Sequence, residues 1–275
     1  MNRARASGAE ISSAALDGGS ARIDWGGREI ALEYLRIGDP SSTLPIVVFL
    51  HEGLGSVAMW RDFPARFCAA HGLAGLVFSR YGYGRSTPRP AAEHWSPDFM
   101  HRQAFEVLPA LFAALDIAQP WLFGHSDGAS IALLYAARFP VAGVVAVAPH
   151  LFVEDVSITS IEAARKAYRE TDLRQRLARY HADPDSAFHG WNDAWLDPAF
   201  RDWNIEAEIA SIQAPLLAVQ GEDDEYGTLE QIRAIRRRVP QTELLEIPQC
   251  GHSPHRDQPE LLIREAGRFI RMHAR

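Results

Sequence analysis

The chain has 275 residues, enough for one large domain with a substantial core; 47% of them are hydrophobic and 23% are charged. These proportions are typical of a folded globular protein and exclude wholesale disorder. The formal net charge of −7 argues against a nucleic-acid-binding protein, whose surface is expected to be basic.

The cysteines, the apolar runs and the first residues of the chain indicate where in the cell the protein is expected. The two cysteines, Cys68 and Cys250, are too few for a disulfide framework and lack metal-ligand spacing, which favours a reducing, cytoplasmic location. No apolar run approaches the roughly 20 residues that a membrane-spanning helix needs, so no membrane partner is expected. Residues 1–21 are small and polar without the apolar core of a secretory signal, and we expect a mobile N-terminal arm there.

The first half of the chain predicts strands that alternate with helices. Residues 22–38 alternate apolar with polar side chains around a Gly-Gly turn, which is typical of a β-hairpin. Short continuous apolar runs, typical of strands buried on both faces, then lie at 45–51, 73–80, 120–125, 141–149 and, further along, 215–221. Helical patterns separate them at 57–71, 97–116 and 127–139. This alternation predicts βαβ units and a mostly parallel sheet.

The alternation stops between about residues 151 and 208. A charged amphipathic helix, EAARKAYRETDLRQRLARYH, leads into FHGWNDAWLDPAFRDW, which is rich in tryptophan and phenylalanine. Because this stretch is too long for a loop in a compact domain, we expect a helical lid at 151–208. Its aromatic residues either fix the lid to the core or line a substrate pocket, and Trp191 and Trp195 are the candidates for contact with substrate.

After this stretch the core pattern resumes. The strand 215–221 is followed by the acidic loop GEDDEYGT, a helix at 228–238, a strand at 241–248, the loop QCGHSPH and a final helix at 258–273. The core is therefore expected to consist of residues 22–150 and 209–275.

The segment Gly124-His125-Ser126-Asp127-Gly128 stands between a predicted buried strand and a predicted helix. That is the context of a nucleophile elbow, in which glycines let strand and helix approach around an exposed serine. A serine hydroxyl needs a base and a group that orients the base. His252, between the last strand and the last helix, is the candidate base, with His255 as the alternative.

The orienting acid is expected where the strand after the lid ends. Glu222, Asp223 and Asp224 are the carboxylates there, and any of them would give the order Ser…acid…His of hydrolase triads.

Four motifs give the chain a resemblance to a known family: LHEGLGS after the third strand, SRYGYGRS after the fourth, GHSDG, and the paired GEDD and GH loops. From about residue 22 to 273 the chain resembles the α/β-hydrolases, in particular compact, lid-bearing serine esterases. The resemblance implies a mostly parallel twisted sheet flanked by helices, with an inserted helical lid. It also selects Asp224 as the acid, because in this family the acid usually lies three residues after the glycine.

Acyl transfer also needs donors preorganised for the oxyanion, typically two backbone N–H groups. One is expected at Asp127, directly after the nucleophile, and the resemblance assigns the other to Gly53. Glu52 stands where the family usually has glycine; its carboxylate either braces the loop or adds charge to the pocket mouth. The Asp127 carboxylate either interacts with the helix dipole or pairs with a cationic group of the substrate, as the resemblance suggests.

These features predict a serine hydrolase that cleaves carboxylic esters or thioesters of small, rather apolar acyl groups through an acyl-enzyme. Ser126 would attack, His252 would act as base and Asp224 would orient it. The same residues could instead cleave an amide or a carbon–carbon bond beside a ketone, or make peracids, and the fold can also serve as a non-catalytic ligand receptor. No metal or organic cofactor is implied, the expected partner is a small-molecule ester, and the oligomeric state is left open.

Overall fold

The computed structural model describes residues 16–38 and 46–274, which form an eight-stranded sheet in the order β1-β2-β4-β3-β5-β6-β7-β8. β1 and β2 are an antiparallel hairpin, β2 pairs antiparallel with β4, and the remaining pairs are parallel. The strands are β1 (Leu16–Trp25), β2 (Arg28–Ile37), β3 (Val47–Leu50), β4 (Gly75–Phe78), β5 (Trp121–His125), β6 (Gly143–Val147), β7 (Leu216–Gly221) and β8 (Glu243–Ile247). The predicted fold class, a mostly parallel sheet flanked by helices, is confirmed.

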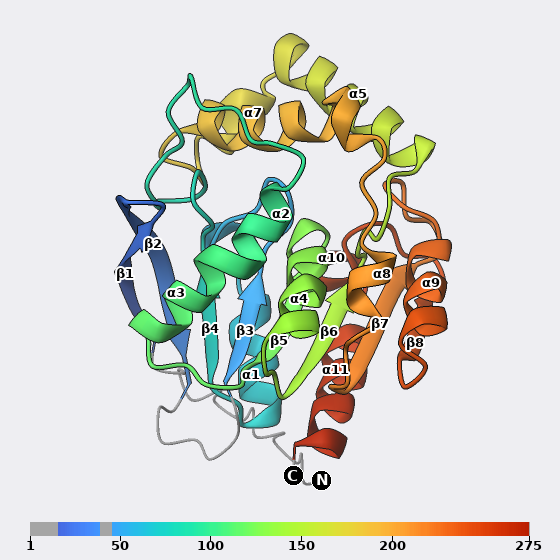
Figure 1. The fold of residues 1–275 in the computed structure, drawn as a ribbon. Coiled ribbons are helices and arrows are strands. Elements are labelled where there is room, and N and C mark those ends of the chain that lie inside the picture. The colour runs from blue at the N-terminus through green and yellow to red at the C-terminus, as the bar shows by residue number, and fades with distance from the viewer. Residues whose placement is uncertain (1–15, 39–45, 275) are drawn as a thin grey trace, which may run out of the picture.

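Helices cover both faces of the sheet (Figure 1). One apolar cluster lies under α3 (Leu108–Ala114), α4 (Asp127–Arg138), α8 (Glu206–Ile209) and α9 (Glu230–Arg238). A second lies on the opposite face, under α1 (Phe63–His71) and α11 (Pro259–His273). Every residue of β3 to β7 is buried, which explains why these strands are apolar throughout instead of alternating.

Between β6, which ends at Val147, and β7, which begins at Leu216, the chain leaves the sheet and forms a helical insertion. Its main helices are α5 (Asp155–Glu170), α6 (Leu173–Leu177) and α7 (Pro184–Trp195), followed by the 3₁₀-helix η3 (Pro198–Phe200) and α8. Figure 1 shows α5 and α7 above the carboxyl ends of the parallel strands. The two ends of the insertion meet where Ile205 N donates to Leu151 O at 2.8 Å.

The N-terminal boundary differs from the expectation of an arm that extends to residue 21. β1 already begins at Leu16, which pairs with Ile37 of β2. Residues 16–20 join the sheet through their backbones while their side chains stay largely exposed, so no apolar alternation marks them as a strand. The remainder of the predicted arm, 1–15, lies outside the described residues.

The helix expected at 97–116 is divided. It consists of α2 (Phe99–Arg102), a π-helical segment η2 (Gln103–Val107) and α3, and Leu108 N donates to Gln103 O across five residues. Pro109, near the start of α3, has no N–H for the regular four-residue bond, which accounts for the wider turn.

The helix predicted at 57–71 is shorter than expected, since α1 begins at Phe63, whereas the final helix matches the predicted 258–273 to within one residue; a separate short turn precedes each. A 3₁₀-helix η1 (Ala58–Trp60) comes before α1, and α10 (Pro254–Asp257) comes before α11. Within 16–38 and 46–274, no helix combines the length and apolarity needed to cross a membrane.

Candidate active site

Ser126 occupies a sharp turn between β5 and α4. Its backbone has φ 53° and ψ −123°, a region that residues other than glycine rarely adopt. A Cβ at Gly124 would lie 2.4 Å from Gly128 O, and one at Gly128 would lie 2.2 Å from Leu50 O. Both glycines are therefore needed for strand and helix to approach this closely, as expected for a nucleophile elbow.

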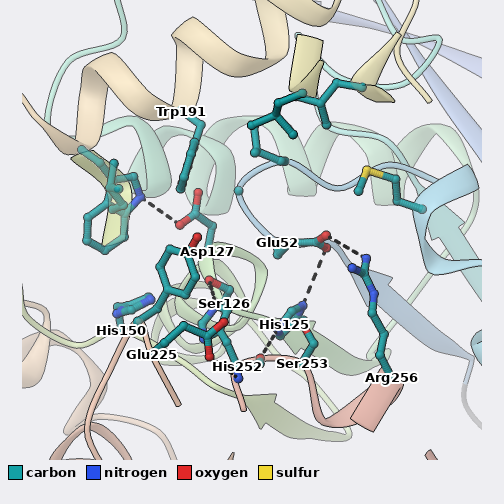
Figure 2. Close-up of a pocket in the computed structure, with 18 residues that line it drawn as sticks. Glu52, His125, Ser126, Asp127, His150, Trp191, Glu225, His252, Ser253 and Arg256 are labelled. Carbon is teal, nitrogen blue, oxygen red and sulfur yellow. Dashed lines mark hydrogen bonds and ion pairs between the residues drawn. The ribbon is translucent and has the colours of Figure 1, made fainter. Parts of the chain in front are cut away.

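Three predicted site residues form one series of hydrogen bonds at the carboxyl ends of the strands. Nε2 of His252 lies 2.9 Å from Oγ of Ser126 (Figure 2). Nδ1 of His252 lies 2.9 Å and 3.0 Å from the two carboxylate oxygens of Asp224. Ser126 follows β5, Asp224 follows β7 and His252 follows β8, so the parallel sheet brings together residues far apart in sequence.

The Asp224 carboxylate is fully buried yet well supplied with donors. Besides His252, it accepts hydrogen bonds from Gln220 Nε2 at 2.8 Å and from the backbone N–H groups of Tyr226 at 2.8 Å and Gly227 at 3.2 Å. Burial by itself would raise the pKa of Asp224, but the hydrogen bonds from His252 and Tyr226 outweigh it and lower the pKa. The side chain is thus an anion that can hold His252 in one orientation.

The backbone of His252 is held on both sides. His125, the residue before Ser126, places Nε2 2.7 Å from the His252 carbonyl, and His252 N donates to Oε2 of Glu225 at 3.1 Å.

The alternative base, His255, packs against Trp60 and Phe63, and in the described part of the chain neither of its ring nitrogens has a hydrogen-bond partner. Burial lowers the pKa of His255 well below its usual value, which fits a core position.

The Asp127 carboxylate is fully buried beside the serine. Its Oδ1 accepts a hydrogen bond from Nε1 of Trp195 at 3.0 Å, and its Oδ2 lies 3.7 Å from a guanidinium nitrogen of Arg80. Burial raises the pKa of Asp127, while Arg80 and Trp195 oppose the rise. The cation next to this carboxylate is therefore internal, a pairing that neither of the two expectations for Asp127 included.

Glu52 both braces its loop and faces the cavity (Figure 2). Its Oε2 lies 3.7 Å from Nδ1 of His125, and its Oε1 lies 3.5 Å from a guanidinium nitrogen of Arg256. Burial would raise the pKa of Glu52, but His125 and Arg256 lower it well below the usual value. The side chain thus links the loop after β3 to the elbow and to α10.

A cavity of about 300 Å³ opens beside Ser126. Gly53 and Asp127, the two residues expected to supply oxyanion donors, line it, and so do Trp191 and Trp195 from the helical insertion. A Cβ on Gly53 would lie 2.2 Å from Nε1 of Trp191, so only glycine fits beneath this indole. The other apolar side chains of the lining are Leu54, Met59, Ile161, Leu173 and Leu177.

Residues 47–265 match the model of a family described as "Alpha/beta hydrolase family". The chain belongs to the alpha/beta hydrolase family. Its fold, elbow and strand-end residues are those that the sequence motifs led us to expect of such a hydrolase.

Relatives of this alpha/beta hydrolase span most of its length. It is 24% identical over 271 residues to the 2-succinyl-6-hydroxy-2,4-cyclohexadiene-1-carboxylate synthase of Enterobacter sp. (strain 638), covering 86% of this chain and 95% of the relative. It is also 24% identical over 268 residues to the Mus musculus sn-1-specific diacylglycerol lipase ABHD11, covering 85% and 83%. Family and relatives together support general hydrolase activity.

Solved structures agree on the fold. A thermophilic esterase from Thermogutta terrifontis superposes with a TM-score of 0.73 at 17% identity, covering 94% of this hydrolase and all (100%) of the esterase.

His150 is a cavity residue of this alpha/beta hydrolase that the sequence motifs did not reveal. It follows β6, its ring lies 5.9 Å from that of His252, and it faces the cavity (Figure 2). Burial, with His252 adding to the effect, lowers its pKa to about 3, so the imidazole is neutral. Its position directly after a predicted buried strand is the signal that could have found it.

Proposed function

We propose that this chain is a serine hydrolase that cleaves carboxylic esters or thioesters of small, rather apolar acyl groups. The observation that carries the proposal is the unbroken series of hydrogen bonds from Asp224 through His252 to Ser126, which ends at a cavity. This is the arrangement that activates a serine hydroxyl in Ser-His-Asp hydrolases.

The reaction proceeds in two acyl transfers. In the first, Nε2 of His252 accepts the hydroxyl proton while Oγ of Ser126 bonds to the substrate carbonyl carbon, and the same proton then passes to the leaving alcohol or thiol. In the second, water attacks the acyl-enzyme, again giving its proton to His252, and the acid leaves as Ser126 regains its proton. Asp224 stays ionised and stabilises the imidazolium that forms in each step.

The negative oxygen of each tetrahedral intermediate is stabilised by the backbone N–H groups of Gly53 and Asp127. Asp127 is the first residue of α4, where an N–H has no acceptor within its own helix. Gly53 belongs to the loop after β3 and also lines the cavity.

The cavity supports the choice of substrate class. Its volume of about 300 Å³ lies at the small end of ligand pockets, and aliphatic and indole side chains form much of its wall. Short acyl groups would bury their carbon atoms there while the ester carbonyl stays beside Ser126.

The experiment that tests the proposal compares wild type with Ser126→Ala on p-nitrophenyl acetate and butyrate, with matched thioesters and anilides as further probes. We expect Ser126→Ala to lose at least about a thousandfold in kcat, since the nucleophile is absent. Ser211→Ala, at an exposed position outside the cavity, is the control. A fluorophosphonate should label Ser126 in wild type; near-wild-type ester hydrolysis by Ser126→Ala, or labelling at another residue, would contradict the proposal.

A further inference from the structure

Arg80 is a buried cation behind the cavity wall. Its side chain is 1% exposed, stacks on the ring of Tyr83 and is not among the residues that line the cavity. One guanidinium nitrogen donates to the Glu52 carbonyl at 2.8 Å and lies 3.7 Å from Oδ2 of Asp127. Arg80 therefore contacts the two chain segments that supply the proposed oxyanion donors.

The Glu52 carbonyl is held by three donors. They are Arg80 at 2.8 Å, Nδ1 of His51 at 2.7 Å and the backbone N–H of Gly55 at 3.1 Å. The role of His51 follows from its other nitrogen, since Nε2 accepts from the backbone N–H of Arg80 at 3.0 Å and the ring proton must then sit on Nδ1. Arg80 thus acts on this carbonyl in two ways. Its guanidinium donates to the carbonyl directly, and its backbone N–H fixes the tautomer of His51.

The direction of the next N–H follows from peptide geometry. In a planar trans peptide the C=O and the N–H point in opposite directions. The carbonyl of the Glu52–Gly53 peptide is turned toward Arg80 and His51, which are both buried. The N–H of Gly53 must then point the other way, toward the cavity that Gly53 lines.

We propose that Arg80 is a positioning residue for the oxyanion hole, aiming the Gly53 N–H through the Glu52 carbonyl and tying that loop to Asp127. The inference rests on the proposed serine hydrolase function. It assigns Arg80 no contact with substrate: the guanidinium acts only through the Glu52 carbonyl and the Asp127 carboxylate.

The variants must separate this role from simple charge balance. Arg80→Met alone leaves the Asp127 carboxylate buried without its cation. The informative protein is therefore the double variant Arg80→Met/Asp127→Asn, which lacks both charges but keeps the backbone N–H of residue 127. Asp127→Asn alone is its reference. Arg85→Met, an exposed arginine on the same turn, is the matched control.

Two ketones report on the oxyanion hole. 1,1,1-Trifluoro-2-hexanone forms a hemiketal in which Ser126 Oγ bonds to the carbonyl carbon, the hydroxyl proton passes to His252 and the ketone oxygen becomes the oxyanion. 2-Hexanone has nearly the same shape but is far less electrophilic, so its binding reports on the cavity alone. Inhibition constants for both, with kcat and KM for p-nitrophenyl butyrate, are measured for each variant.

We expect the double variant to bind the trifluoromethyl ketone about a hundredfold more weakly than Asp127→Asn, as for the loss of one oxyanion donor. kcat should fall by a similar factor, while KM and the inhibition constant of 2-hexanone change less than about threefold. Arg80→Lys keeps a cation for Asp127, but its ammonium ends one bond short of the guanidinium nitrogen that donates to the Glu52 carbonyl, and we expect a smaller loss, still above about threefold. Arg85→Met should match wild type.

Equal affinity of the double variant and Asp127→Asn for the trifluoromethyl ketone would overturn the inference, and so would a parallel loss of affinity for both ketones, which indicates a general structural role. Should the double variant not fold, wild-type affinity in Arg80→Lys overturns it. In each case, loss of hydrolysis in Ser126→Ala leaves the proposed function standing, whereas activity in Ser126→Ala overturns the proposed function itself.

Discussion

Nε1 of Trp195 donates a hydrogen bond to Oδ1 of Asp127 at 3.0 Å, and both side chains are buried. This contact joins α7 of the helical insertion to the residue that follows Ser126. The indole is therefore more than a hydrophobic contact between the insertion and the core, because it satisfies a carboxylate that has little access to water.

Trp195→Phe keeps most of the ring volume but removes this donor. We expect the free energy of unfolding, measured by urea denaturation, to fall by about 1–3 kcal/mol, because a buried acceptor is left unpaired. Trp203→Phe is the control, since the indole N–H of Trp203 is buried without a hydrogen-bond partner in the described part of the chain. An equal loss in both variants would mean that the hydrogen bond to Asp127 contributes nothing beyond packing.

Asp224→Asn tests whether Asp224, rather than its neighbours Glu222 and Asp223, is the acid that orients His252. We expect kcat for p-nitrophenyl butyrate to fall about 10³- to 10⁴-fold, because a neutral amide neither stabilises the imidazolium nor fixes the tautomer of His252. Asp223→Asn, one residue earlier and exposed, should stay within about twofold of wild type. If the two variants were equally active, the orienting role would not belong to Asp224.

Gly53→Ala tests the close contact between the loop after β3 and α7. The new Cβ would lie 2.2 Å from Nε1 of Trp191, so either the loop or the indole must move. We expect kcat/KM to fall at least about tenfold, since a small displacement of an oxyanion donor is costly.

Gly53→Ala/Trp191→Ala relieves the collision and should recover part of the kcat/KM lost in Gly53→Ala, measured relative to Trp191→Ala. Gly18→Ala is the control, because a Cβ there meets only ordinary contacts at 3.7 Å. No recovery in the double variant would show that Trp191 is not what excludes a side chain at residue 53.

His150 predicts a pH dependence of stability. Its folded pKa of about 3 lies below the ordinary histidine value of 6.5, so the unfolded chain binds the proton more readily. The stabilisation is complete above pH 6.5 and is lost as the pH falls toward the folded pKa, by about 1.4 kcal/mol per pH unit.

His150→Gln removes the titrating group, so the stability difference between wild type and the variant should shift against wild type between pH 6.5 and pH 4. Urea denaturation at a series of pH values measures this shift, and the exposed His94 gives the control His94→Gln. A difference that stays constant across this range would contradict the neutral, buried state of His150.

Much of the fold could be predicted because burial on both faces makes a strand apolar throughout. β3 to β7 are such strands, and each lies within a run that the sequence shows. The exposed residues at the start of β1 lack that signal, since backbone pairing alone places them in the sheet. The π-helical segment depends on Pro109. A disturbance of the helix at this proline could be predicted, but not that it takes the form of a π-helical turn.

The candidate site was predictable where residues lie in the segments that follow strands. Ser126 directly follows β5, and Asp224 and His252 lie in the loops after β7 and β8; the carboxyl ends of parallel strands meet at one edge of the sheet. The distances among them do not follow from the pattern.

Contacts between loops were beyond prediction. The pairing of Arg80 with Asp127 depends on how the loop after β4 packs beside the start of α4, and that of Glu52 with Arg256 on where α10 lies. Neither relation leaves a periodic trace in the sequence, because each is set by tertiary packing.

The backbone at Ser126 has a consequence for how this position evolves. Glycine adopts a φ of 53° without strain, whereas a residue with a side chain holds it at a cost of about 1–3 kcal/mol. Selection for thermal stability alone would favour glycine at residue 126. The serine at residue 126 thus stands against the conformational preference of the backbone, and homologues without hydrolytic activity would be free to replace it by glycine.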